Sequence, residues 1–147
     1  MTTSSRFTVA LHILTLLAHA GEEALTSEYV AGSVNTHPVV IRRLLALLRT
    51  ARLVTSQGGT GGGWRLARAA RGITLRDVYR AVEGGALFAP HAAEPNARCP
   101  VGGHIQEALS SRFRTAEVAL EDDLARSTVA DLLQDVRART PRGAARR

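Results

Sequence analysis

Arginine is the residue type whose spacing in this chain most plainly suggests a chemistry. Between positions 29 and 76 the sequence has no Asp or Glu, and its basic residues there are Arg42, Arg43, Arg49, Arg52, Arg65, Arg68, Arg71 and Arg76. A guanidinium group donates paired hydrogen bonds to phosphates and to guanine edges. A folded stretch without acids favours a nucleic acid as partner, and a solvated arginine-rich surface is the alternative.

The chain has one thiol, Cys99, between Arg98 and Pro100. We expect a long helix to begin at Cys99 and Pro100, and both a helix N-terminus and a neighbouring cation stabilise a thiolate. A lone thiolate can form a sulfenic acid, accept a glutathione-type cap or bridge to a second subunit. The position therefore predicts a redox sensor, with a small apolar residue that simply packs as the alternative.

A metal site or a thiol enzyme would need more ligands or catalytic groups than the sequence provides. His12, His91 and His104 could join Cys99 around a soft metal. His12 falls near the apolar side of its predicted helix, where a core histidine is the better interpretation. No acidic residue at motif spacing would orient His104 as a base for Cys99. We therefore predict neither a metal, nor a cofactor, nor an enzyme.

The net charge of +6 is unevenly distributed over the 147 residues. Residues 1–80 carry +6, residues 81–139 carry −3, and residues 140–147 carry +3. One cysteine excludes a disulfide framework within the chain, and no apolar run is long enough for a membrane span. The N-terminus lacks a secretory pattern. These observations predict a cytoplasmic protein without a membrane partner.

Periodicity predicts the elements that would position the arginines. A break at Asn35 and Thr36 separates two helices, and Pro38 suits the first turn of the second one. The Gly-rich run joins strand to strand and lacks the Gly-Lys-Ser/Thr ending of a nucleotide-binding loop. The predicted segments are a helix over 6–20, a helix capped by Thr26 or Ser27 that runs through 34, a helix from Pro38 to 49, and strands over 51–56 and 64–67 around glycines at 58–63.

The second half of the chain predicts three more helices. Thr74 with Asp77, and Thr128 with Asp131, have the spacing of capping boxes. The segments are a helix from 73 to the glycines at 84–85, a loop over 86–98, a helix of about 25 residues from Cys99 and Pro100, a helix from Thr128, and a loose basic tail over 140–147. On the long helix, an apolar seam faces one partner helix. This seam consists of Ile105, Leu109, Phe113, Ala116, Leu120 and Leu124.

Three helices followed by a hairpin are typical of a winged helix-turn-helix, here mainly α with a small β-hairpin and a long C-terminal dimerisation helix. The third helix would be the recognition helix, with His37, Val39, Arg42 and Arg43 facing the groove. Phosphate contacts are predicted for Arg49, Arg52, Arg65 and Arg68. Trp64 is predicted to anchor the hairpin on the core. Double-stranded DNA is thus the expected partner.

The sequence also resembles the Rrf2 family of bacterial transcriptional regulators. The matching stretches are 5–12, 39–44, 61–68, 73–78 and 81–84. The resemblance implies a homodimer, paired or swapped through the helix at 101–125, that binds a palindromic operator and usually represses. It divides the chain into a DNA-binding domain (1–85), a sensor loop with dimerisation helices (86–139) and a flexible tail (140–147).

The resemblance also bears on the cofactor. Iron–sulfur members of the family hold their cluster with three cysteines in the loop before the long helix, and this chain has only Cys99 there. It is closer to the YwnA-like branch, in which a single cysteine stands in a Cys-Pro-Val-Gly sequence, here residues 99–102. We therefore expect no cluster, and an oxidant or small molecule as effector. A regulator that acts mainly by docking a partner protein is the alternative.

Overall fold

The apolar periodicity of the sequence produces a mainly α fold with one hairpin, as predicted. The computed structural model of the protein describes residues 4–141. Its elements are α1 (Arg6–Ala20), α2 (Ser27–Val34), α3 (Pro38–Thr50), β1 (Val54–Gln57), β2 (Gly63–Leu66), the 3-10 turn η1 (Ala70–Gly72), α4 (Leu75–Val82), α5 (Ile105–Leu124) and α6 (Val129–Arg139).

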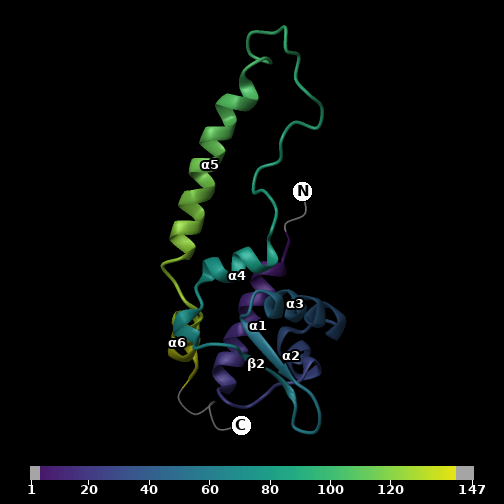
Figure 1. Ribbon diagram of the computed structural model, residues 1–147. Coiled ribbons are helices and arrows are strands. Elements are labelled where there is room, and N and C mark those ends of the chain that lie inside the picture. The colour runs from purple at the N-terminus through teal and green to yellow at the C-terminus, as the bar shows by residue number, and fades with distance from the viewer. Residues whose placement is uncertain (1–3, 142–147) are drawn as a thin grey trace.

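The helices α1 to α4, the hairpin and α6 form a head around one core (Figure 1). Each helix contributes the side chains that recur at three- and four-residue steps, because these positions share one face. The last helix returns to pack on α1 and η1, which buries Val129. The fully buried large side chains are Ile13, Leu14, Leu17, Val30, Ile41, Leu45, Leu48, Leu53, Val54, Ile73, Val78 and Val129.

Side-chain caps fix where α2, α4 and α6 begin. The Thr26 hydroxyl accepts a hydrogen bond from the backbone N–H of Tyr29 at 3.1 Å. Both predicted capping boxes are confirmed, one at the start of α4 and the other at the start of α6. In each box the threonine hydroxyl accepts from the N–H three residues later, and the aspartate there accepts from the N–H of the threonine.

The hairpin pairs β1 with β2 antiparallel, with Val54 opposite Leu66 and Gln57 opposite Gly63. The first strand begins three residues later than predicted. Arg52 adopts a left-handed φ of 61°, and the N–H of Leu53 bonds to the carbonyl of Leu48 at 2.9 Å. These contacts satisfy the last carbonyls of α3, so residues 51–53 belong to the end of the helix.

The predicted long helix also begins later than expected. It starts at Ile105 with His104 as N-cap, whereas residues 100–104 form turns. Cys99 thus precedes the helix by several residues, and the prediction of a helix from Cys99 was wrong. Two consecutive glycines at 102 and 103 lower the helix propensity there.

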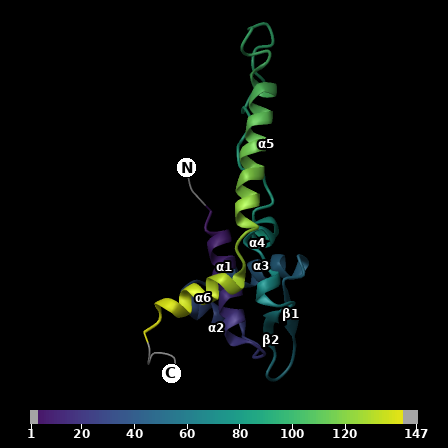
Figure 2. The same ribbon diagram turned by 90° about the vertical axis from the view of Figure 1, so that its left-hand side faces the viewer.

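A loop over 84–104 and α5 together form an arm that rises from the head, away from the hairpin tip (Figures 1 and 2). No residue of α5 is buried. Of its six seam residues only Ala116 is exposed, and the other five are half-buried. The phenyl ring of Phe113 stacks on Phe88 of the loop, with ring centres 4.5 Å apart.

The arm is joined to the head by an ion pair between α4 and α5. The guanidinium of Arg80 donates to both carboxylate oxygens of Glu121, at 2.7 and 3.2 Å. This contact lowers the pKa of Glu121 from its ordinary value and raises that of Arg80. Of the predicted tail, residues 140 and 141 end the described chain, and residues 142–147 lie outside it.

Candidate nucleic-acid interface

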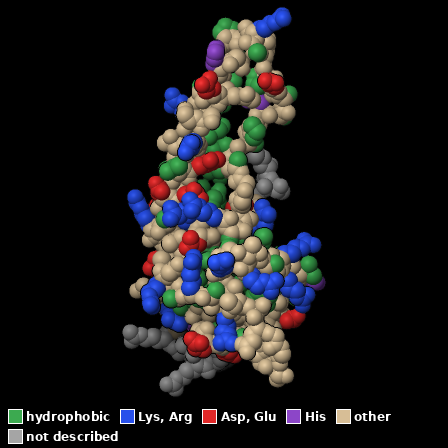
Figure 3. Space-filling view, viewed as in Figure 1, with side chains coloured by type: hydrophobic (Ala, Val, Ile, Leu, Met, Phe, Trp, Pro, Cys, Tyr) green, Lys and Arg blue, Asp and Glu red, His purple; other side chains and the backbone are tan. Residues whose placement is uncertain are grey.

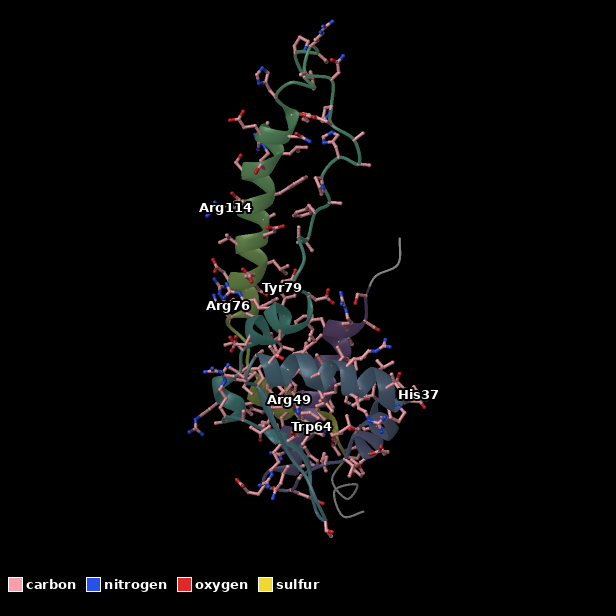
Figure 4. All side chains as sticks on the ribbon, turned by 45° about the vertical axis from the view of Figure 1, so that its right-hand side comes forward. His37, Arg49, Trp64, Arg76, Tyr79 and Arg114 are labelled. Carbon is pink, nitrogen blue, oxygen red and sulfur yellow. The ribbon has the colours of Figure 1, made fainter. Side chains whose placement is uncertain are left out.

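The helix α3 has an apolar side and an opposite, outer face. We define the outer face by four residues: His37, at the N-cap, and Val39, Arg42 and Arg43. Ile41, Leu44, Leu45 and Leu48 are buried against the rest of the head, so the opposite side is left to solvent. All four residues of the outer face are exposed. This exposure agrees with the sequence prediction that these side chains lie away from the core, and Figure 4 shows His37 at the outer end of the head.

His37 caps the N-terminus of α3 through its side chain. Its Nδ1 accepts a hydrogen bond from the N–H of Val39 at 3.1 Å, which makes the imidazole the N-cap of the helix. A neutral ring that accepts at Nδ1 carries its proton on Nε2. The Nε2–H therefore remains a donor at the N-terminal end of the outer face, beside Pro38 in the first turn.

The two arginines of the outer face differ in their surroundings. Arg42 donates from Nη2 to Oε1 of Glu28 at 2.5 Å, across the gap between α3 and α2. The pKa of Glu28 is lowered, first by a hydrogen bond from its own backbone N–H and then by the bond from Arg42. Among the described residues, no carboxylate oxygen lies within 4 Å of Arg43.

Arg49, predicted to bind phosphate, links α3 to the hairpin. Its Nη1 donates to the hydroxyl of Ser56 at 3.2 Å, and its guanidinium carbon lies 5.3 Å from the centre of the Trp64 ring (Figure 4). Trp64 packs against the core, as predicted, and its backbone forms a bridge with Leu25 at 2.8 and 3.0 Å. Arg49 thus joins α3 to the hairpin through side-chain contacts, beside the backbone bridge between Leu25 and Trp64.

The remaining predicted phosphate contacts surround the hairpin. Arg65 donates to the amide oxygen of Gln57 across the two strands, and Arg68 pairs with Asp77 at 3.1 Å. Arg52 is exposed at the turn into β1. Arginine side chains spread over the head in the space-filling view, while both signs of charge alternate along the arm (Figure 3). All predicted DNA contacts therefore belong to the head.

Close backbone approach explains two of the glycines in the hairpin. A Cβ on Gly63 would lie 2.6 Å from the carbonyl oxygen of Leu25, and φ at Gly63 is 149°. A Cβ on Gly62 would lie 2.2 Å from the carbonyl oxygen of Gln57. Only glycine fits these two positions, so the run is needed for the tight turn and for the Leu25 bridge.

Glu28 is the residue of this face that sequence reasoning missed. It stands one position before the acid-free stretch, and an acid in the first turn of α2 is already explained by the helix end. Its contact with Arg42 spans fourteen positions and depends on how α2 packs against α3. No local pattern in the sequence carries that information.

Cys99 belongs to the loop of the arm, and its exposed side chain comes directly before the turns over 100–104. The backbone N–H groups of Gly102 and Val101 donate to the sulfur and lower the pKa of the thiol. The direction agrees with the stabilised thiolate expected from the sequence, but its cause is this turn rather than a helix end or the charge of Arg98. Gly102 is required there, because a Cβ would meet the carbonyl oxygen of Asn96 at 2.5 Å.

The histidines considered as metal ligands have other surroundings. His12 is exposed and its Nε2 lies 3.0 Å from the Ser33 hydroxyl, so it is not the core residue that the sequence suggested. Over residues 4–141, no three His, Cys, Asp or Glu side chains come together as they would around a metal ion. The donor set of one chain, with a single thiol, does not fit an iron–sulfur cluster.

The arm contains a groove. This groove of about 880 Å³ runs between the loop and α5, beside the Phe88 and Phe113 stack, and His91, Gln106 and Arg114 line its polar side.

None of the helices over residues 4–141 combines the length and the apolar composition that crossing a bilayer requires.

Comparison with known proteins identifies a family. The model of the Rrf2 family, described as an iron-dependent transcriptional regulator, matches residues 3–135. A protein of Bacillus subtilis that is named as the HTH-type transcriptional regulator YwnA is 43% identical over 131 residues, which are 88% of this chain and 96% of YwnA.

Solved structures agree with these sequence matches. The structure of T. potens IscR has a TM-score of 0.72 and 26% identity, and the match covers 99% of this chain and 96% of that one. The structure of CymR, the global cysteine regulator of B. subtilis, has a TM-score of 0.67 and 25% identity, covering 91% and 97%. The fold prediction is thereby confirmed, as is the prediction that the chain is not an enzyme, because the matching proteins are regulators.

Proposed function

Because the chain belongs to the Rrf2 family of transcriptional regulators, we propose that it is a sequence-specific repressor that binds a palindromic operator as a homodimer. The observation that carries this proposal is the outer face of α3, with the hairpin joined to the same helix by Arg49. A helix with an apolar back and exposed donors is what the major groove of B-DNA accepts. Such a protein acts in the cytoplasm, where the DNA is.

The outer face supplies the base-reading groups in this proposal. Arg42 and Arg43 donate to base edges, with guanine N7 and O6 as the acceptors that suit a guanidinium. The Nε2–H of His37 and the methyl groups of Val39 reach the same groove, and a valine methyl can pack on a thymine methyl.

Phosphates are bound around this face by Arg49, Arg52, Arg65 and Arg68. Arg49 and Arg65 are ordered by contacts within the chain, so little side-chain entropy is lost when a phosphate takes their remaining N–H groups. Arg68 shares its guanidinium with Asp77, which reduces its contribution relative to Arg52. These contacts set the register of the protein on DNA and carry no sequence information.

A homodimer is proposed because α5 carries an apolar seam that the chain itself covers only in part: Ala116 is exposed, the other five seam residues are half-buried and none is buried. A long helix with one apolar stripe is unstable in water unless a second helix covers the stripe. A second copy of α5 satisfies this requirement and gives a two-fold axis, so the two recognition helices meet inverted half-sites. Residues 86–139 then serve as the sensor loop and dimerisation segment.

Cys99 is the proposed sensor, and the chain is proposed to work without an iron–sulfur cluster. When a peroxide reacts with the Cys99 thiolate, the sulfur attacks one oxygen and the O–O bond breaks. The sulfur is oxidised by two electrons to a sulfenic acid, and the departing hydroxide takes a proton to form water. The lowered pKa of the exposed thiol supports this chemistry, because the thiolate is the reactive form.

Selection of bound duplexes from a random pool tests this function. The expected result is enrichment of an inverted repeat by the reduced protein, and loss of binding after treatment with peroxide. The Cys99→Ser variant should enrich the same repeat and remain bound after the same treatment. Failure to enrich any sequence would refute the regulator proposal, and equal oxidant sensitivity of Cys99→Ser would refute the sensor. Transcription in vitro from a promoter that contains the repeat should fall when the protein is added.

A further inference from the structure

Glu28 is the one carboxylate that reaches an arginine of the outer face within the described residues. We propose that Glu28 is a specificity-determining positioning residue: it holds the Arg42 guanidinium in the orientation that reads a base. This inference rests on the proposed function, since it concerns how the same face recognises DNA.

The geometry makes Glu28 a fixed support. It stands in the first turn of α2, whose start is capped by Thr26, and its own backbone N–H is the first cause of the lowered pKa of its carboxyl group. The N-terminal end of a helix favours a negative charge at this place. The carboxylate accepts the 2.5 Å bond from Nη2 of Arg42. The backbone of α2 is thus fixed at Glu28, and its carboxylate lies within hydrogen-bond distance of one guanidinium, that of Arg42.

The arginine retains the donors that it needs. A guanidinium carries five N–H groups, and the contact with Oε1 of Glu28 is made by Nη2. The other N–H groups stay free to approach a base edge. The side chains of Arg42 and Glu28 are 53% and 65% exposed, so the pair lies where DNA would be. Arg43, one position on, has no such carboxylate among the described residues.

The negative charge of Glu28 should affect general DNA affinity and base preference differently. A carboxylate on a surface that binds a polyanion weakens attraction to every sequence equally. The same carboxylate increases discrimination if it restricts an arginine to the rotamer that matches one base pair, because an unrestrained arginine can turn toward a phosphate or another base. The proposal thus predicts opposite effects on general affinity and on base preference.

The test compares the base preferences of the wild type and five variants on the selected operator and on all single-base-pair variants of one half-site. The proteins are the wild type, Glu28→Ala, Arg42→Ala and the double variant, with Glu28→Gln as a graded change that keeps an acceptor oxygen. Glu23→Gln is the matched control, because this exposed acid precedes α2 and is not in any of the ion pairs found among the described residues. Thermal unfolding confirms that each variant is folded.

We expect Arg42→Ala to lose preference at one base pair or at two adjacent ones. At the same place Glu28→Ala should lower the ratio of affinities about tenfold, while it binds the non-preferred duplexes more tightly. Glu28→Gln should lie between, Glu23→Gln should keep the wild-type ratios, and Glu28→Ala should have no further effect on the ratio when Arg42 is already absent.

The results that would overturn the proposal differ from those that would overturn the function. Wild-type base ratios in Glu28→Ala, combined with altered ratios in Arg42→Ala, would contradict only the role of Glu28. An effect of Glu28→Ala that persists in the double variant would mean that it acts through the fold of α2, which also contradicts it. A wild-type protein without any base preference would contradict the regulator function itself, and the role of Glu28 with it.

Discussion

At the scale of single residues, the arginines of the head divide into those that chain contacts hold and those that stand free. Arg49 is held by Ser56 and the face of Trp64, whereas Arg43 is exposed with no carboxylate within 4 Å among the described residues. Held and free arginines should respond differently to substitution, because only the held ones contribute to the free energy of unfolding.

Replacing Arg49 with Ala should therefore destabilise the head and loosen the hairpin. The lost hydrogen bond and cation–π contact are worth about 1 to 2 kcal/mol together. Urea unfolding followed by circular dichroism measures this difference. Arg43→Ala is the control and should change the free energy of unfolding by less than about 0.5 kcal/mol. Equal stabilities of the two variants would contradict the role given to Arg49.

Cys99 yields a prediction about pH. Because backbone N–H groups lower the pKa of its thiol, the thiolate forms at lower pH in the folded protein than in the unfolded chain. Alkylation by iodoacetamide should thus show its half-maximal rate at a lower pH in the native protein than in guanidinium chloride, where the turn is lost. The same midpoint in both conditions would contradict the turn as the cause.

The sequence predicted the residues of the interface better than their contacts. The outer face follows from periodicity. Ile41 and Leu44 are three residues apart and share the apolar side of a helix, which leaves Arg42 and Arg43 between them for the other side. The bond from Arg42 to Glu28 could not be predicted, since it joins two helices whose packing angle is a tertiary property.

At the scale of elements, caps and glycines decide the boundaries. The starts of α4 and α6 were predictable from the spacing of Thr74 with Asp77 and of Thr128 with Asp131, because a capping box is a local device. The start of α5 was not, because Pro100 suggested a helical first turn while the two glycines after it favoured turns. The left-handed φ at Arg52 shifted β1 in the same way, since arginine gives no signal for that conformation.

The glycines of the hairpin should differ sharply in their tolerance of a methyl group. Gly63→Ala places a Cβ against the Leu25 carbonyl at an unfavourable φ and should cost more than about 1 kcal/mol of unfolding free energy. Gly58→Ala enters open space and should change stability by less than about 0.5 kcal/mol. Thermal unfolding of the two variants checks this, and equal melting temperatures would contradict the close approach at Gly63.

At the scale of the whole molecule, the head carries the proposed DNA contacts and the arm carries Cys99 and the apolar seam. The two parts meet at α4, which packs against α3 on one side and pairs through Arg80 with Glu121 of α5. The resemblance in sequence implied the helical partner of the seam, but a single chain cannot supply it.

Disrupting the seam should separate the subunits without unfolding the head. Phe113→Asp puts a charge at the centre of the seam. If the proposed dimer forms through this seam, light scattering should show a dimer for the wild type and a monomer for this variant. Ser111→Asp, on the opposite side of the exposed helix, adds the same charge and should remain a dimer. Circular dichroism should be unchanged in both. A dimeric Phe113→Asp protein would contradict dimerisation through the seam.

The most direct measurement of the central claim is the ratio of affinities for the selected operator and for a scrambled duplex of the same composition, at one fixed salt concentration. We expect a ratio of about 1,000 or more for the wild type. In the variant with both Arg42 and Arg43 replaced by Ala, this ratio should collapse toward one, and binding of the scrambled duplex should weaken only modestly. A wild-type ratio near one, or an unchanged ratio in the double variant, would contradict the account.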